Sequence, residues 1–195
     1  MTITDAQRDV RTVFLGGFAG HLVSSGIWFL SAATAAWRSP IAAMEVLVIA
    51  GIFIFPITQL LLRLMARPSS LPKGHPMNAL AMQVAFVLPL SLPLVFAATA
   101  YRQNWFYPAF MIALGAHYLP FIFLYGMWQF GLLAALLMGS GMAIGLYFPS
   151  SFSLGGWTAA LTLFVFAFVG RSAALSGKLS RLPVAIPSPE KQTVR

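Results

Sequence analysis

Long apolar runs, separated by short polar or proline-rich stretches, make up most of the chain. Six of these runs come close to the roughly 20 residues that an α-helix needs to cross a bilayer. They predict six transmembrane helices, at about 12–36, 41–65, 78–100, 107–125, 129–148 and 157–176. Because backbone groups in lipid must be paired within the protein, the expected fold is an all-α, polytopic transmembrane helical bundle over residues 12–176.

Polar segments flank and interrupt this bundle. Residues 1–11 form a polar N-terminal segment, in which Thr4 and Gln7 have the spacing of a capping box and predict a short interfacial helix. Residues 66–77, between the second and third spans, are rich in turn-forming residues and predict a loop. Residues 177–195 form a basic tail.

The composition agrees with a membrane protein. The chain is 59% hydrophobic and 8% charged, whereas a soluble domain carries about 25% charged residues. Apolar runs of this length indicate helices rather than the shorter alternating strands of a membrane barrel. The absence of cysteine excludes disulfides, thiolate metal ligands and thiol catalysis.

The net charge of +8 fits a membrane topology, and we do not expect a nucleic-acid partner. With six spans, both termini and the 66–77 loop share one side of the membrane. That side holds most of the basic residues: Arg8, Arg11, Arg63, Arg67, Lys73, Arg171, Lys178, Arg181, Lys191 and Arg195. The other side holds Arg38 and Arg102. The positive-inside rule therefore predicts cytoplasmic N and C termini in an inner (plasma) membrane, with lipid as the surrounding partner.

Two histidines lie deep inside predicted spans. His21 is about 14 Å from the inner end of the first span, and His117 about 15 Å from the outer end of the fourth. Both depths fall near the middle of a roughly 30 Å hydrocarbon core. An ionisable group at that depth is costly and indicates a polar site. The two side chains meet there if the first and fourth spans are neighbours.

Four other polar residues occupy the predicted spans or their ends: Glu45, Gln83, Gln59 and Asn78. With the two histidines they outline a path for a small solute or ion, from Glu45 past His117 and His21 towards the other three. Interhelical hydrogen bonding, worth about 0.6–2 kcal/mol per contact, is the alternative for the amides. For Glu45 the alternative is an interfacial position near Arg38.

Prolines and glycines mark irregular or closely packed helices. Four prolines lie inside predicted spans: Pro56, Pro89, Pro93 and Pro120. They suggest helix breaks that free carbonyl groups, as at transporter sites. The alternative is that they have no special role, since proline is common in membrane helices. The pairs Gly16/Gly20 and Gly141/Gly145 have the spacing of close helix contacts, within one chain or in a homo-oligomer.

Several chemistries find no support. The chain lacks the HExxH, GxSxG, P-loop and EF-hand patterns. Glu45 is the one acidic residue inside a predicted span, which excludes a pair of intramembrane carboxylates. We expect no metal site and no cofactor, and a haem or metal held by His21 and His117 is the alternative.

Two motifs resemble a known family. They are Lys73-Gly74-His75-Pro76-Met77-Asn78 and Gly115-Ala116-His117-Tyr118-Leu119-Pro120-Phe121. Together they resemble a bacterial family of small six-helix integral membrane proteins classed as a domain of unknown function. The resemblance implies an inner-membrane location and a six-helix bundle, and it implies no activity.

The sequence thus predicts a small-solute or ion transporter or a channel-like protein with a mid-membrane polar site. One alternative is an intramembrane enzyme or cofactor carrier that uses His21 and His117, although no catalytic pattern favours an enzyme. The other is a non-catalytic scaffold or accessory subunit whose basic loop and tail face anionic lipid or a partner.

Overall fold

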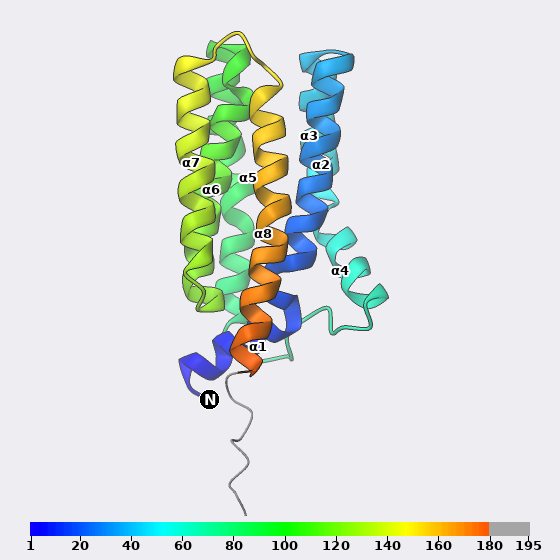
Figure 1. Cartoon of the computed structure of the whole chain (residues 1–195), viewed down its shortest axis with the longest axis vertical. Coiled ribbons are helices and arrows are strands. Elements are labelled where there is room, and N and C mark those ends of the chain that lie inside the picture. The colour runs from blue at the N-terminus through cyan, green and yellow to red at the C-terminus, as the bar shows by residue number, and fades with distance from the viewer. Residues whose placement is uncertain (180–195) are drawn as a thin grey trace, which may run out of the picture.

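The computed structural model describes residues 1–179, with side chains described for residues 1–176. The rest of the predicted basic tail lies outside the described residues. Every regular element in the described part is helical: α1 (Ile3–Phe14), the 3-10 turn η1 (Leu15–Gly17), α2 (Phe18–Trp37), α3 (Pro40–Ile52), α4 (Ile54–Leu64), α5 (Asn78–Tyr101), the 3-10 turn η2 (Gln103–Trp105), α6 (Phe106–Tyr125), α7 (Gln129–Tyr147) and α8 (Leu154–Leu179). The long helices run side by side in one bundle (Figure 1).

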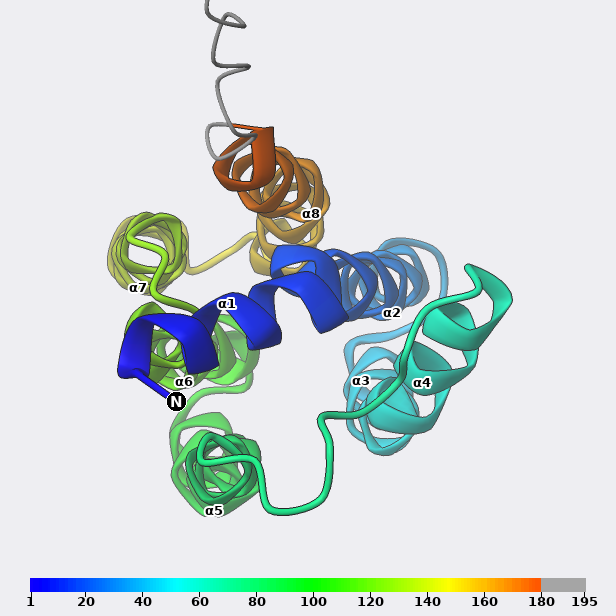
Figure 2. The same cartoon turned by 90° about the horizontal axis from the view of Figure 1, so that it is seen from below.

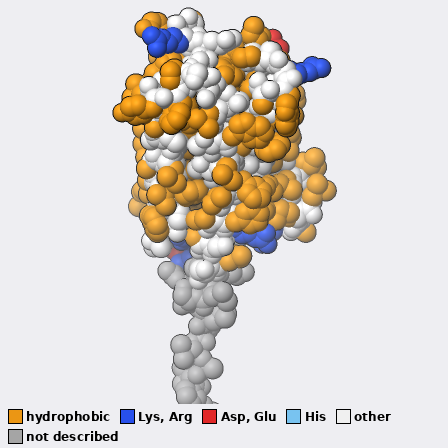
Figure 3. Space-filling view, turned by 45° about the horizontal axis from the view of Figure 1, so that its top comes forward, with side chains coloured by type: hydrophobic (Ala, Val, Ile, Leu, Met, Phe, Trp, Pro, Cys, Tyr) orange, Lys and Arg blue, Asp and Glu red, His pale blue; other side chains and the backbone are white. Residues whose placement is uncertain are grey.

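The helical membrane fold is confirmed. Five helices in the described part of the chain are long and apolar enough to cross a membrane: Ile3–Trp37, Asn78–Tyr101, Gln103–Tyr125, Gln129–Tyr147 and Leu154–Ser176. The helices α3 and α4 pass the same test only as a pair, bent by 55°. The six predicted spans are therefore reached when this bent pair counts as one span. Hydrophobic side chains cover the visible flank of the bundle, and basic side chains lie towards its ends (Figure 3).

The second predicted span is two helices rather than one. It begins where Ser39 caps α3, since the Ser39 hydroxyl accepts a hydrogen bond from the Ala42 backbone N–H at 3.2 Å. It breaks at Phe53, between α3 and α4. Pro56 lies in the first turn of α4, where its missing N–H leaves no helical hydrogen bond unmade, so it stops α3 from continuing straight.

The other prolines predicted to break helices do not interrupt them. Pro89 and Pro93 lie inside the continuous helix α5, and Pro120 lies inside α6. A membrane helix tolerates proline when nearby groups and small backbone adjustments satisfy the freed carbonyl.

The N-terminal helix α1 begins differently from the prediction. The capping box is formed by Thr2 and Asp5, not by Thr4 and Gln7. The helix ends at η1, where Leu15, Gly16 and Gly17 all have positive φ angles, which interrupt the right-handed helix. As a result α1 crosses the lower end of the bundle beneath α6 (Figure 2).

Two side chains hold α1 against the end of α6. The Gln7 amide donates a hydrogen bond to the Phe123 carbonyl at 2.6 Å. The Arg11 guanidinium donates to the Gly126 carbonyl at 3.2 Å. Both acceptors are carbonyls at the C-terminal end of α6, where the last carbonyls lack the partners of the helix interior; the Phe123 carbonyl also accepts from the Gly126 backbone N–H at 3.3 Å. These two hydrogen bonds hold α1 across the lower end of the bundle.

Small residues set the closest helix contacts. Gly16 in η1 lies against Gly170 of α8, where a Cβ on Gly16 would fall 2.2 Å from the Gly170 carbonyl oxygen. Gly141 of α7 lies against the Pro108 carbonyl of α6, and Gly145 against the Trp105 ring. These glycines pack within the chain. Gly20 is different, since a Cβ there would meet nothing within 4 Å.

The buried core joins α2, α6, α7 and α8. In its upper part the Ser31 hydroxyl donates to the Ala43 carbonyl at 2.7 Å and shares a hydrogen bond of 2.6 Å with the Tyr107 hydroxyl. Trp28 packs on Tyr107 with ring centroids 5.9 Å apart. On the other side of the bundle, α5 packs along α6 while α4 packs along α2.

Candidate functional site

A cavity of about 570 Å³ lies between α2, α4, α5 and α6. This volume is within the roughly 300–1,000 Å³ typical of small-molecule sites. Its lower end is lined by Val10 and Phe14 of α1 and by Leu71, which lies in the loop between α4 and α5. The positions of α1 and of the loop beneath α5 can be followed in Figure 2.

Both predicted histidines line this cavity. His21 comes from α2 and is 3% exposed, and His117 comes from α6. The Tyr118 ring lies between them, with centroid distances of 5.2 Å to His21 and 5.4 Å to His117. The structure therefore brings the two histidines to one site, bridged by an aromatic ring.

The Nδ1 atoms of both histidines are buried and have no hydrogen-bond partner. The backbone of Val84 on α5 lies beside the His117 ring and helps to position it. Gly17 makes room for the other ring, because a Cβ on Gly17 would be 3.0 Å from Cε1 of His21. Each imidazole is thus packed against neighbouring backbone, and its buried Nδ1 makes no hydrogen bond within the described part of the chain.

Sequence reasoning missed a third polar group in the cavity. The Thr58 hydroxyl of α4 lines it, and its oxygen is also buried without a partner. No local signal marks Thr58, because threonine is tolerated throughout membrane helices. Ser24, one turn after His21 on α2, lines the same cavity and is buried.

The other members of the predicted path lie elsewhere. Glu45 and Gln83 are exposed, Gln59 is half-buried, and none of the three lines the cavity. The Asn78 amide donates to the Pro72 carbonyl at 3.0 Å and so closes the loop before α5. The structure joins the two histidines and leaves the four other residues out of the site.

The loop motif at residues 73–78 connects the loop before α5 to α1 at the lower end of the bundle. His75 is buried, its Nδ1 accepts a hydrogen bond from the Met77 backbone at 3.2 Å, and its Nε2 lies 3.5 Å from a carboxylate oxygen of Asp9 on α1. Gly74 supplies a positive φ of 77°. Lys73 and Pro76, on either side, are exposed.

A second loop contact supports this arrangement. The Arg67 guanidinium donates a hydrogen bond to the Thr12 carbonyl near the end of α1. The loop is therefore attached to α1 at two points, through His75 and through Arg67. Both attachments lie below the cavity and give its lower end a defined shape.

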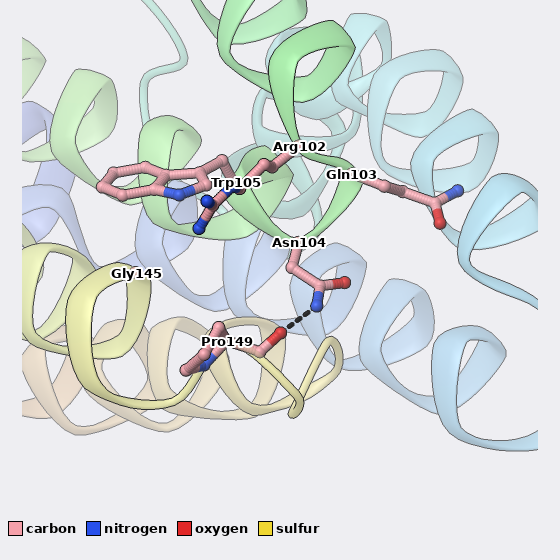
Figure 4. A pocket seen from close by; sticks show the side chains of 6 residues that line it. All are labelled: Arg102, Gln103, Asn104, Trp105, Gly145 and Pro149. Atoms are coloured by element: carbon pink, nitrogen blue, oxygen red, sulfur yellow. Dashed lines mark hydrogen bonds between the residues drawn. The ribbon is translucent and has the colours of Figure 1, made fainter.

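A smaller cavity of about 260 Å³ lies at the opposite end of the bundle. It is formed by two turns that a hydrogen bond joins, from the Asn104 side-chain amide to the Pro149 carbonyl (Figure 4). Arg102 and Gln103 are exposed at its edge. This hydrogen bond links the turn between α5 and α6 to the turn between α7 and α8, which is a structural role.

No group of three or more His, Cys, Asp and Glu side chains gathers anywhere in the described part of the chain. The two cavity histidines instead face apolar and aromatic side chains. Such surroundings favour hydrogen bonding to an uncharged ligand.

Fold and site together define a polytopic helical membrane protein with a ligand-sized cavity among its helices. The chain belongs to the DUF7010 family, a family of unknown function, whose model matches residues 3–171. This confirms the predicted membership of a family of unknown function. Neither a curated protein nor a solved structure matches the chain.

Proposed function

We propose that this protein binds a small uncharged solute in the cavity between α2, α4, α5 and α6 and transports it across the membrane. The supporting observation is the set of buried, unpartnered polar atoms around that cavity: His21 Nδ1, His117 Nδ1 and Thr58 Oγ1. A buried polar atom without a partner costs about 1–3 kcal/mol. A solute that hydrogen-bonds to these atoms offsets that cost.

The residues that line the cavity favour an uncharged solute over an ion. Among the described lining residues there is no Asp, Glu, Lys or Arg. A charged solute would need a counter-charge or water at this depth. We therefore restrict the solute-or-ion prediction to neutral solutes.

The bend between α3 and α4 is the moving part in the proposed transport. Gly51, Ile52 and Ile54 line the cavity on both sides of the break at Phe53. Discontinuous helices border substrate sites in many transporters, and hinges are short segments that absorb changes in φ and ψ. A change of the 55° bend would alter access to the histidines.

The test is solute flux in proteoliposomes. Entry of neutral polyols, amides and aromatic alcohols is followed by light scattering, and leaflet exchange of a fluorescent long-chain alcohol by dithionite quenching. We expect the wild-type protein to accelerate at least one probe over empty vesicles. His117→Ala removes one hydrogen bond, worth about 0.5–1.5 kcal/mol, and should slow that probe by roughly two- to twelvefold.

Gln83→Ala is the matched control, because Gln83 is exposed on α5 outside the cavity. It should transport at the wild-type rate. Wild-type vesicles that perform like empty vesicles with every probe contradict the proposal. Equal rates for His117→Ala and the wild-type protein contradict the role of the cavity.

A further inference from the structure

One wall of the cavity is aromatic. Tyr118, Phe121 and Tyr125 line it from α6, with a spacing that places them on one helical face. The Tyr118 and Phe121 rings lie 5.3 Å apart, and the Phe121 and Tyr125 rings lie 5.6 Å apart and almost parallel. Aromatic pairs favour such distances, so this wall suits a flat ring better than a branched or globular molecule.

The polar atoms lie at one end of this wall. The His21 ring contacts Tyr118 at 5.2 Å, and His117 precedes Tyr118 in the chain and contacts Phe121 at 5.1 Å. A neutral imidazole has one N–H donor and one acceptor nitrogen, and the threonine hydroxyl both donates and accepts. A hydroxyl or carbonyl on a ring satisfies these groups without introducing charge.

The opposite wall is apolar and opens to the side. Ala81, Ala85 and Leu88 of α5 face the cavity, as do Ile52 and Phe55 of the α3–α4 pair. Ala85 is exposed, and Ile52 and Phe55 are each 71% exposed. Since α5 packs along α6 and α4 packs along α2, the rim lies between α4 and α5 on the flank of the bundle.

The lower end of the cavity is covered. Val10 and Phe14 of α1 line it together with Leu71 of the loop that follows α4. A flank that lies in the apolar part of the bundle faces lipid tails, so the side opening leads to the hydrocarbon of the bilayer.

We infer that, at the solute site of the proposed transport, the ligand is a neutral ring-bearing lipid that enters sideways from the bilayer between α4 and α5. Its planar ring packs on Tyr118, Phe121 and Tyr125, and a hydroxyl or carbonyl on the ring hydrogen-bonds to His21 and His117. Its apolar chain leaves between α4 and α5, where the apolar side chains of Ile52, Phe55 and Ala85 line the cavity and are exposed.

The test uses photolabelling of the full-length protein in lipid nanodiscs. The probe is a benzoquinone with a decyl chain that carries a diazirine, and labelled residues are mapped by mass spectrometry. We expect labelling concentrated around Ile52 at the end of α3, Phe55 on α4 and Ala85 on α5. Unlabelled decyl-benzoquinone should compete for this labelling, whereas decanol, which has a hydroxyl and a chain but no ring, should compete at least tenfold less well.

Two pairs of variants separate the portal from the polar end. Ala85→Trp fills the rim from a lipid-facing position and should reduce labelling at least fivefold. Ala97→Trp, at an exposed position on the same helix outside the cavity, should leave labelling unchanged. His117→Ala should reduce labelling, while Gln83→Ala should not. Size-exclusion profiles and circular dichroism check that each variant is folded.

Three results overturn the inference: uniform labelling of all lipid-facing helices, equal competition by decanol, or unchanged labelling of Ala85→Trp. Flux of a polar solute without quinone binding rejects the lipid and retains the proposed transport. Specific quinone binding without flux of any probe retains the ligand class and rejects transport. The two proposals therefore fail in distinguishable ways.

Discussion

The contact between Gly16 and Gly170 offers a direct test of how η1 packs against α8. In the substitution Gly170→Ala, the new Cβ would lie 2.4 Å from the Gly16 carbonyl oxygen. A carbon–oxygen contact normally needs about 3.3–3.6 Å, so α8 must shift by about 1 Å. The obstructing atom belongs to the backbone of η1 and cannot be relieved by a side-chain rotation.

The expected cost is that of overpacking, about 1–3 kcal/mol. Alanine is also a better helix former than glycine by about 0.8–1.0 kcal/mol, and this gain must be removed from the comparison. Gly139→Ala on α7 provides the control, since a Cβ at Gly139 meets nothing within 4 Å. Both variants gain the same propensity, so their difference reports the contact alone.

Thermal unfolding of the purified protein in detergent measures that difference. For a chain of this size each 1 kcal/mol shifts Tm by roughly 2–4 °C, so Gly170→Ala should unfold about 2–12 °C below Gly139→Ala. Gly17, the next residue in η1, lies beside the His21 ring, because a Cβ added there would be 3.0 Å from Cε1 of His21, so ligand binding should weaken as well. Equal Tm values for the two variants refute the close contact and the reasoning that depends on it.

Three other predictions follow from single side chains. Gly20→Leu should fill the cavity and abolish probe binding without lowering Tm. The control is Gly26→Leu, since Gly26 is exposed on the same helix and a Cβ there meets nothing within 4 Å, so this variant should bind the probe normally. Photolabelling measures the binding and thermal unfolding measures Tm. Ser31→Ala leaves the buried Tyr107 hydroxyl without its partner and should cost about 1–3 kcal/mol, seen as a lower Tm, while an unchanged Tm contradicts that bond. Gln7→Ala removes the hydrogen bond from α1 to the end of α6, and hydrogen exchange should become faster in α1 but not in α7; equal acceleration in both helices contradicts the local attachment.

Part of the site was within reach of sequence reasoning. His21 and His117 are predictable from the sequence, because an ionisable residue inside a long apolar run is easily recognised and indicates a site. Thr58 and the aromatic wall of Tyr118, Phe121 and Tyr125 were not identified, because such residues occur on every face of a membrane helix. Gln83 was grouped with the histidines by depth alone, and the structure turns it outward.

The membrane class and the approximate helices were determined by the sequence alone. Length and hydropathy are local properties, and a bilayer demands the same apolar run wherever the helix finally packs. The helix breaks were only partly local. Pro56 marks a real bend, whereas Pro89, Pro93 and Pro120 lie in continuous helices, because neighbouring groups decide whether a proline is accommodated.

Only the tertiary structure decided which helix faces form the cavity. In a soluble helix the polar face reveals the buried one, but in a membrane helix both lipid and core faces are apolar, so the pattern of residues carries little information on rotation. Gly16 and Gly20 illustrate this, since they share one predicted motif, yet one packs against α8 and the other lines the cavity. The cavity exists because η1 and the Phe53 bend direct α1 and α4 around the histidines, and those directions depend on contacts between distant parts of the chain.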